Sequence, residues 1–196
     1  MSTQHLTVNP ARRRYLGMAL ALAFSAPFAH AAEESTETFD EDSILKAASD
    51  FLGDTTEGLA KVIAKAFKEQ GRPSAYIKGE EIAGAITLGL RYGEGQLQFK
   101  HGGSSKLYWQ GPSIGFDLGG NASKVFVLVY HAQNREQLLK RFPSLDGSFY
   151  YIGGAGINYQ QRDDIILAPI RLGVGLRAGA SIGYTHYTLN KSLNPL

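Results

Sequence analysis

One serine and one histidine have the order of a hydrolase pair. Ser113 is the central residue of Gly111-Pro112-Ser113-Ile114-Gly115, which matches the G-x-S-x-G pattern of serine hydrolases, and His186 follows it in the chain. That pattern needs a strand that turns sharply into a helix, whereas residues 116–120 have the character of strand and turn. Hydrolysis through Ser113 and His186 is therefore the alternative hypothesis and not the preferred one.

Arginine and aromatic residues inside apolar strands form a second candidate site, for binding rather than catalysis. A buried charge is costly unless it is paired. Each arginine therefore either faces water, which is the favoured interpretation, or turns inward to a carboxylate such as Asp117. Inward-facing arginines beside Trp109 and Tyr108 would bind an anion or a lipid headgroup. The candidate ligand-binding residues are Arg91, Tyr92, Tyr108, Trp109, Asp117, Arg171 and Arg177.

The residue types give little support to metal or cofactor chemistry. The chain contains no cysteine and its histidines lack ligand spacing, so we predict no metal and no cofactor. Glu80-Glu81 and Asp163-Asp164 are adjacent carboxylates, and adjacent residues of a strand point to opposite faces of the sheet. Each pair is therefore interpreted as a turn or strand-entry feature.

The elements that would position the candidate residues are short strands separated by glycine. Nineteen of the 23 glycines fall between Gly79 and Gly183. Pro169 indicates an edge strand or a bulge, because proline cannot donate to the sheet. A strand spacing of about 8 to 12 residues predicts a mainly β, small antiparallel β-barrel over 73–196. The predicted strands are 86–92, 96–100, 107–110, 114–118, 125–130, 149–152, 157–160, 165–172 and 176–189, with turns at 93–95, 101–103 and 119–121 and a short inserted helix at 134–141.

A helical segment over 43–72 precedes the strands. Its second helix is amphipathic, with apolar residues at helical spacing and three lysines on the other face. The favoured interpretation packs the apolar face on the core, where Val125–Tyr130 is apolar on both faces and needs a cover. The same helix could touch an anionic bilayer. The apolar stripe is Leu59, Val62, Ile63, Ala66 and Phe67, and the lysines are Lys61, Lys65 and Lys68.

The first 31 residues have the pattern of a cleaved export signal. Three arginines from Arg12 to Arg14 precede an apolar run of about ten residues, and Ala29-His30-Ala31 matches the small-x-small cleavage site. Arg12-Arg13-Arg14-Tyr15-Leu16 fits the core of the twin-arginine pattern, whereas Ala11 and Gly17 depart from it. The Sec route is favoured, because an ordinary Sec signal also carries several basic residues. We therefore predict a periplasmic protein with a signal peptide at 1–31.

Charge excludes one class of partner. Three of the 20 basic residues lie in the predicted signal, so the mature chain contains 17 basic and 18 acidic residues. Basic residues are not clustered, and we expect no nucleic-acid partner. Residues 32–42 are rich in acid and predict a disordered, solvated leader.

The most distinctive run of residues is Tyr108-Trp109-Gln110-Gly111-Pro112-Ser113-Ile114-Gly115-Phe116-Asp117, preceded by Tyr92-Gly93-Glu94-Gly95. Tyr151-Ile152-Gly153-Gly154 and Pro169-Ile170-Arg171 follow later. On these residues the chain resembles the proteobacterial envelope integrity protein A family, from about Ala75 to the C-terminus. The resemblance implies a periplasmic small β-barrel that is required for a sound cell envelope, with no established reaction. The glycine pattern is more distantly similar to the SYLF lipid-binding domain.

We therefore predict a non-enzymatic periplasmic protein that supports cell-envelope integrity by binding a lipid, a glycan or an envelope protein partner. The alternative is a serine-dependent hydrolase that acts on an envelope ester through Ser113 and His186. Peripheral membrane contact is left open, and we expect no transmembrane segment in the mature chain.

Overall fold

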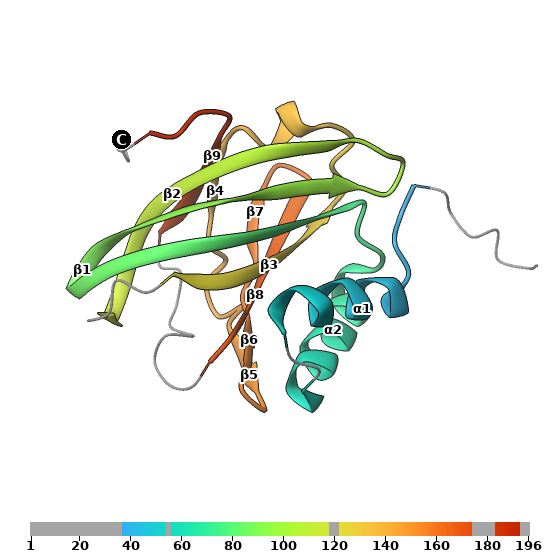
Figure 1. Cartoon of the computed structure of the whole chain (residues 1–196), viewed down its shortest axis with the longest axis horizontal. Coiled ribbons are helices and arrows are strands. Elements are labelled where there is room, and N and C mark those ends of the chain that lie inside the picture. Colours follow the sequence, from blue (N-terminus) through green and yellow to red (C-terminus); the bar gives the residue numbers. More distant parts are fainter. Residues whose placement is uncertain (1–36, 54–55, 118–121, 174–182, 193–196) are drawn as a thin grey trace, which may run out of the picture. The chain divides into compact units, whose positions relative to one another are not determined.

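Two helices precede nine strands in the computed structural model (Figure 1), counted over the residues that it describes. It describes residues 37–53, 56–117, 122–173 and 183–192, and for 83–88 and 113–117 it describes the backbone alone. The predicted signal peptide at 1–31 and residues 32–36 of the leader lie outside this range. The elements in chain order are α1 (Glu41–Leu52), α2 (Glu57–Gln70), β1 (Ala75–Phe99), β2 (Ser104–Asp117), β3 (Ser123–Tyr130), η1 (Arg135–Leu138), β4 (Arg141–Pro143), β5 (Tyr150–Ile152), β6 (Ala155–Ile157), β7 (Gln160–Arg162), β8 (Ile165–Leu172) and β9 (Tyr184–Thr188).

The helices begin at side-chain caps. The Asp40 carboxylate accepts a hydrogen bond of 2.8 Å from the backbone N–H of Ser43, so α1 starts at Glu41, two residues before the predicted segment. The hydroxyl of Thr56 caps α2, accepting a hydrogen bond of 3.1 Å from the backbone N–H of Leu59. The predicted short helix is confirmed as the single 3-10 turn η1, which Asn134 caps.

The strands form one antiparallel sheet that curls on itself. Within the described part of the chain its order is β4-β9-β2-β1-β3-β8-β6-β5, and β7 also pairs with β8. A bridge joins Ser144, which follows β4, to Gln160 of β7, and the N–H of Leu145 donates to the C=O of Tyr159 at 2.9 Å. These contacts connect β4 at one end of the order to β7 on the far side of β8. The predicted small antiparallel barrel is thus confirmed as a mainly antiparallel, half-barrel fold.

Strand β1 is continuous, where the sequence predicted two strands and a turn at 93–95. Its first half, 75–81, pairs with β3, and its second half, 85–98, pairs with β2. The two halves run back along each other (Figure 1), and a backbone hydrogen bond of 3.0 Å joins Lys100 to Ser74 at their ends. A Cβ on Gly95 would lie 2.8 Å from the Cα of Gly79. The predicted turn at 93–95 was wrong, because the chain does not reverse at these residues. Their glycines instead permit the two halves of β1 to approach each other closely.

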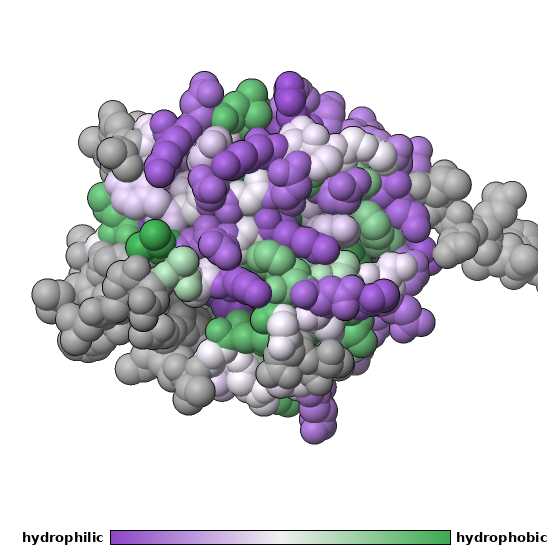
Figure 2. All heavy atoms as spheres, viewed as in Figure 1, coloured by the Kyte–Doolittle hydropathy of each residue, from purple (hydrophilic) through white to green (hydrophobic). Residues whose placement is uncertain are grey.

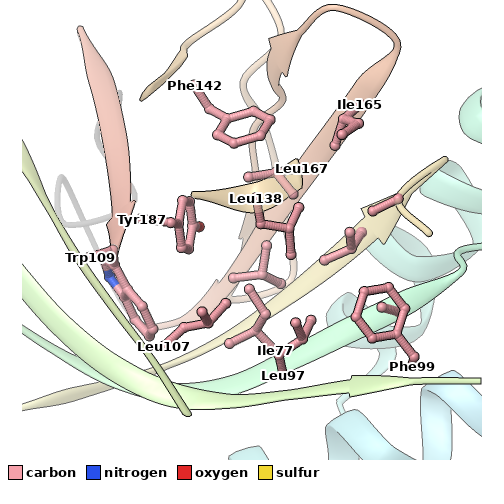
Figure 3. Packing of buried hydrophobic residues seen from close by; sticks show 14 of the residues in the cluster. Ile77, Leu97, Phe99, Leu107, Trp109, Leu138, Phe142, Ile165, Leu167 and Tyr187 are labelled. Atoms are coloured by element: carbon pink, nitrogen blue, oxygen red, sulfur yellow. The ribbon is translucent and has the colours of Figure 1, made fainter. Parts of the chain in front are cut away.

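Strand β3 separates two apolar layers, because its residues are buried on both faces. The layer inside the barrel is packed with aromatic and aliphatic side chains (Figure 3). The second layer lies between the sheet and both helices, so the predicted helical cover of β3 is confirmed. Inner residues include Ile77, Leu97, Leu107, Trp109, Phe142, Leu167 and Tyr187, and outer residues include Ile44, Leu59, Val62, Ile63, Ala66, Phe126, Leu128, Tyr130 and Ile170.

Pro169 sits within β8, which lies between β3 and the β6–β7 segment. The register of the pairing is the same on both sides of the proline, because Ile157 pairs with Ile170 and Gln160 pairs with Leu167. No extra residue is inserted in either strand. The prediction of an edge or a bulge was wrong. Asn158, between β6 and β7, donates its N–H to the Pro169 carbonyl at 3.4 Å. The nitrogen of Pro169, which carries no hydrogen, points to the same side of β8 as this carbonyl. The ladder is interrupted there, and proline is tolerated.

Candidate functional site

A pocket of about 220 Å³ opens between the two halves of β1. One wall comes from Glu80 and Ile82 in the first half of the strand. The other wall comes from the second half and from the neighbouring strands β2 and β9. We call this the outer pocket, and it is lined by Glu80, Ile82, Tyr92, Gly93, Glu94, Tyr108, Trp109, Gln110, Ala122, Thr188, Lys191 and Ser192.

Trp109 is among the residues that line the outer pocket, and its indole lies on the inner face of the sheet, in the core of the barrel. It pairs with Gly93 in the sheet and is 3% exposed. A Cβ on Gly93 or on Gly79 would overlap the indole, so the ring lies against both halves of β1 at the position where their backbones approach. On its inner side the indole packs against Tyr187, with 5.8 Å between ring centroids (Figure 3). Two glycines thus make room for one large aromatic ring.

Two carboxylates and two ammonium groups surround the outer pocket. Glu80 and Glu94 are exposed, and Lys191 supplies one ammonium. Lys106, outside the lining, donates to Glu94 at 3.2 Å, and its ammonium lies 5.1 Å from the ring centroid of Tyr108. Hydrophilic residues predominate over β1 and β2 on the face seen in Figure 2. The outer pocket therefore combines aromatic rings with carboxylates, and the charges around it balance.

Glu81 lies one residue after Glu80 but on the opposite face, inside the barrel. Its carboxylate accepts two hydrogen bonds from Arg171, at 2.5 Å from Nε and 3.2 Å from Nη2. The Nε of Arg91 lies 3.6 Å from the same group, and the indole N–H of Trp109 donates to it at 3.3 Å. We call Glu81, Arg91 and Arg171 the inner ion cluster. Trp109 therefore contacts both the outer pocket and the inner ion cluster.

The inner ion cluster is tightly packed and strongly stabilised in its charged form. Burial alone would raise the pKa of Glu81, but Arg171 and Arg91 outweigh burial and lower that pKa from 4.5 to about 2. Arg91 also donates to the hydroxyl of Thr185 at 2.9 Å. The described side chains around the cluster leave no space for a water molecule. The cluster is thus a filled part of the interior.

The structure brings the predicted site residues together in two places rather than one. Arg91 and Arg171 lie in the inner ion cluster, so the favoured interpretation of outward-facing arginines was wrong for both. Tyr92 and Tyr108 line the outer pocket. Trp109 belongs to both groups.

Two predicted residues are not described and several others were missed. The side chain of Asp117 and all of Arg177 lie outside the described part. Sequence reasoning missed Glu81 as the carboxylate partner, although strand alternation correctly placed Glu80 and Glu81 on opposite faces. It also missed Glu94 and Gln110. Each lies two residues from a predicted tyrosine, Tyr92 or Tyr108, so strand alternation places it on the same face of the sheet.

Ser113 lies within β2, where its backbone pairs with Gly89. The strand continues to Asp117 on one extended path, so the strand-to-helix turn of a nucleophile elbow is not found at this position. His186 on β9 pairs with Gln110 and with Arg141. Its pKa is lowered by burial and by the nearby Arg141, and its Nδ1 accepts or donates no hydrogen bond among the described atoms. This geometry does not favour a hydrolase at these residues.

No helix in the described part of the chain is both long enough and apolar enough to cross a bilayer. Within the same residues, no three histidine or acidic side chains gather as a metal-ligand set.

We expect acidic pH to lower the stability of the fold by protonating the carboxylate of Glu81. Its pKa in the folded chain lies below the ordinary value of 4.5, so its contribution to stability is complete above pH 4.5 and is lost as the pH falls toward 2. Thermal unfolding followed by circular dichroism between these pH values checks this. The melting temperature of the unaltered protein should fall more steeply than that of Glu81→Gln, which lacks the titrating group. Parallel curves would contradict the expectation.

Comparison with known proteins gives a family and a fold. The sequence profile of the family described as Envelope integrity protein A matches residues 37–196. A crystal structure of a beta-barrel-like, uncharacterized protein from Brucella abortus is 41% identical, with a TM-score of 0.76, over 82% of this chain and 99% of that one. None of the curated proteins matches the chain.

Proposed function

Because the chain belongs to the envelope integrity protein A family, we propose that it works in the periplasm as a non-enzymatic binding protein that supports the cell envelope. Its ligand is an envelope molecule that enters the outer pocket. The export-signal pattern at residues 1–31 supports the periplasmic location.

One observation carries the binding proposal: the concave outer pocket, which has two tyrosine side chains in its lining. A concave site with aromatic walls and a few polar groups is the usual form of a ligand site. Tyr92, Tyr108 and Trp109 come from two neighbouring strands, so a rigid sheet holds their positions. The glycines under the indole have no role in turns and are explained by this arrangement.

Helix α2 gives less support to a membrane-binding surface. Its residues Leu59, Val62 and Ile63 are fully buried against the sheet, so its apolar face is already covered. The opposite face is engaged in ion pairs, Lys61 with Glu57 and Lys65 with Glu69. Binding of lipid through this helix would need it to leave the sheet. The outer pocket needs no such change.

The outer pocket can be tested in a bacterium that lacks its own member of the family. We expect Tyr108→Ala to restore growth in detergent poorly, because the variant removes one aromatic wall. Tyr151→Ala is the matched control, since Tyr151 is an exposed tyrosine on β5 outside the outer pocket. Colony counts on detergent plates provide the measurement. Equal rescue by both variants, at equal protein levels, would refute the role of the outer pocket.

A further inference from the structure

The charges around the outer pocket do not favour a phosphate or other anion as the ligand. Its lining contains two carboxylates, Glu80 and Glu94, and one ammonium, Lys191. The guanidinium groups that could attract an anion lie in the inner ion cluster, where Arg171 holds Glu81 with two hydrogen bonds. Lys106 is paired with Glu94, so the charges at this rim balance and no net positive charge attracts an anion. A lipid headgroup that carries phosphate is disfavoured for the same reason.

The size of the outer pocket sets how much of a ligand it can hold. Its volume of about 220 Å³ is smaller than the roughly 300–1,000 Å³ of sites that enclose a drug-sized molecule. The pocket therefore holds one ring-sized group, and the remainder of a longer molecule continues outside. This fits one residue of a chain-like ligand.

The lining has the two kinds of group that a sugar ring needs. Aromatic faces carry partial negative charge and attract the C–H face of a pyranose. The aromatic side chains on the pocket side of the sheet are Tyr92 and Tyr108. Hydroxyl groups of the ring would meet polar side chains of both kinds, acceptors and donors. These polar groups are Glu80, Glu94, Gln110, Thr188 and Ser192.

From this combination we propose that the outer pocket binds one pyranose ring of an uncharged envelope polysaccharide. This inference rests on the proposed function, since it names the ligand class of the same site. The aromatic faces bind the ring, and the carboxylates and Gln110 orient its hydroxyl groups. Because a single ring is held, binding to a short saccharide has a Kd on the order of 1 mM.

Tryptophan fluorescence tests the inference directly, since Trp109 is the single tryptophan of the sequence. The folded protein is titrated with three neutral oligosaccharides, cellotriose, maltotriose and tri-N-acetylchitotriose. We expect a saturable change in emission with at least one of them, and saturation-transfer NMR signals from the same saccharide. Tyr108→Leu should weaken binding at least about tenfold, whereas Tyr151→Leu should leave it unchanged.

Two outcomes would overturn the inference. One is the absence of both fluorescence and NMR signals with all three saccharides up to about 20 mM, well above the expected Kd. The other is a response to phosphatidylglycerol vesicles or inorganic phosphate without a response to saccharide, which would assign the outer pocket to anions. If either occurs while Tyr108→Ala still fails in the detergent assay, the proposed function stands and the ligand class alone is wrong. If either occurs and Tyr108→Ala rescues growth in detergent as well as Tyr151→Ala does, both the ligand class and the proposed function are wrong.

Discussion

Replacing Glu81 by glutamine is expected to lower the free energy of unfolding by about 3 to 5 kcal/mol, the cost of breaking a buried ion pair by removing one partner. The carboxylate is 5% exposed and accepts hydrogen bonds from Arg171 and Trp109. Glutamine has nearly the same shape, so packing is retained and the charge is lost. Two guanidinium groups, Arg91 and Arg171, would then remain inside the barrel without their shared carboxylate.

Urea unfolding followed by circular dichroism gives this value. Glu94→Gln is the matched control, since Glu94 lies on β1, as Glu81 does, and forms an exposed ion pair with Lys106 of β2. That variant should cost less than about 1 kcal/mol, because water already screens the pair. Equal effects of the two variants would show that the inner ion cluster does not stabilise the fold.

Replacing Gly93 by alanine is expected to cost about 3 kcal/mol, at the upper end of the usual cost of overpacking. The added Cβ would overlap the indole of Trp109, which cannot move inward because it packs on Tyr187. The backbone of Gly93 lies in regular strand and has no positive φ, so the cost comes from the lack of space and not from backbone strain.

The same substitution in a Trp109→Leu background separates the two causes. If the indole is the obstacle, Gly93→Ala should cost less than about 1 kcal/mol when a smaller side chain occupies position 109. Urea unfolding of the four proteins in this cycle supplies the measurement. An unchanged cost in both backgrounds would contradict the contact as its origin.

These two variants also distinguish the roles of Trp109. Glu81→Gln changes its inner hydrogen-bond partner, whereas Gly93→Ala changes the backbone beneath the outer pocket. A ligand in the outer pocket should respond more to a folded Gly93 variant than to Glu81→Gln, because the inner ion cluster has no open space for it. We therefore expect the outer pocket to act in binding and the adjacent inner ion cluster to act in stability.

Local patterns in the sequence were enough to predict the elements whose side chains meet near neighbours. The helical stripe of α2, the strand Ile165–Leu172 and the doubly apolar Val125–Tyr130 follow from periodicity, because burial repeats every 3.6 residues in a helix and every two in a strand. The need for a helical cover over β3 followed from the same logic. These features depend on residues close together in the chain.

Only the tertiary structure decided how β1 folds back and what the buried charges meet. Glu81 and Arg171 are 90 positions apart, so no local pattern pairs them. Gly93 has the same appearance in the sequence as a turn glycine, and its contact with Trp109 arises once β1 and β2 have paired. The export pattern, the barrel class and the candidate aromatic residues were thus readable from composition and spacing. The outer pocket and the inner ion cluster were not, because both are made by long-range packing between strands.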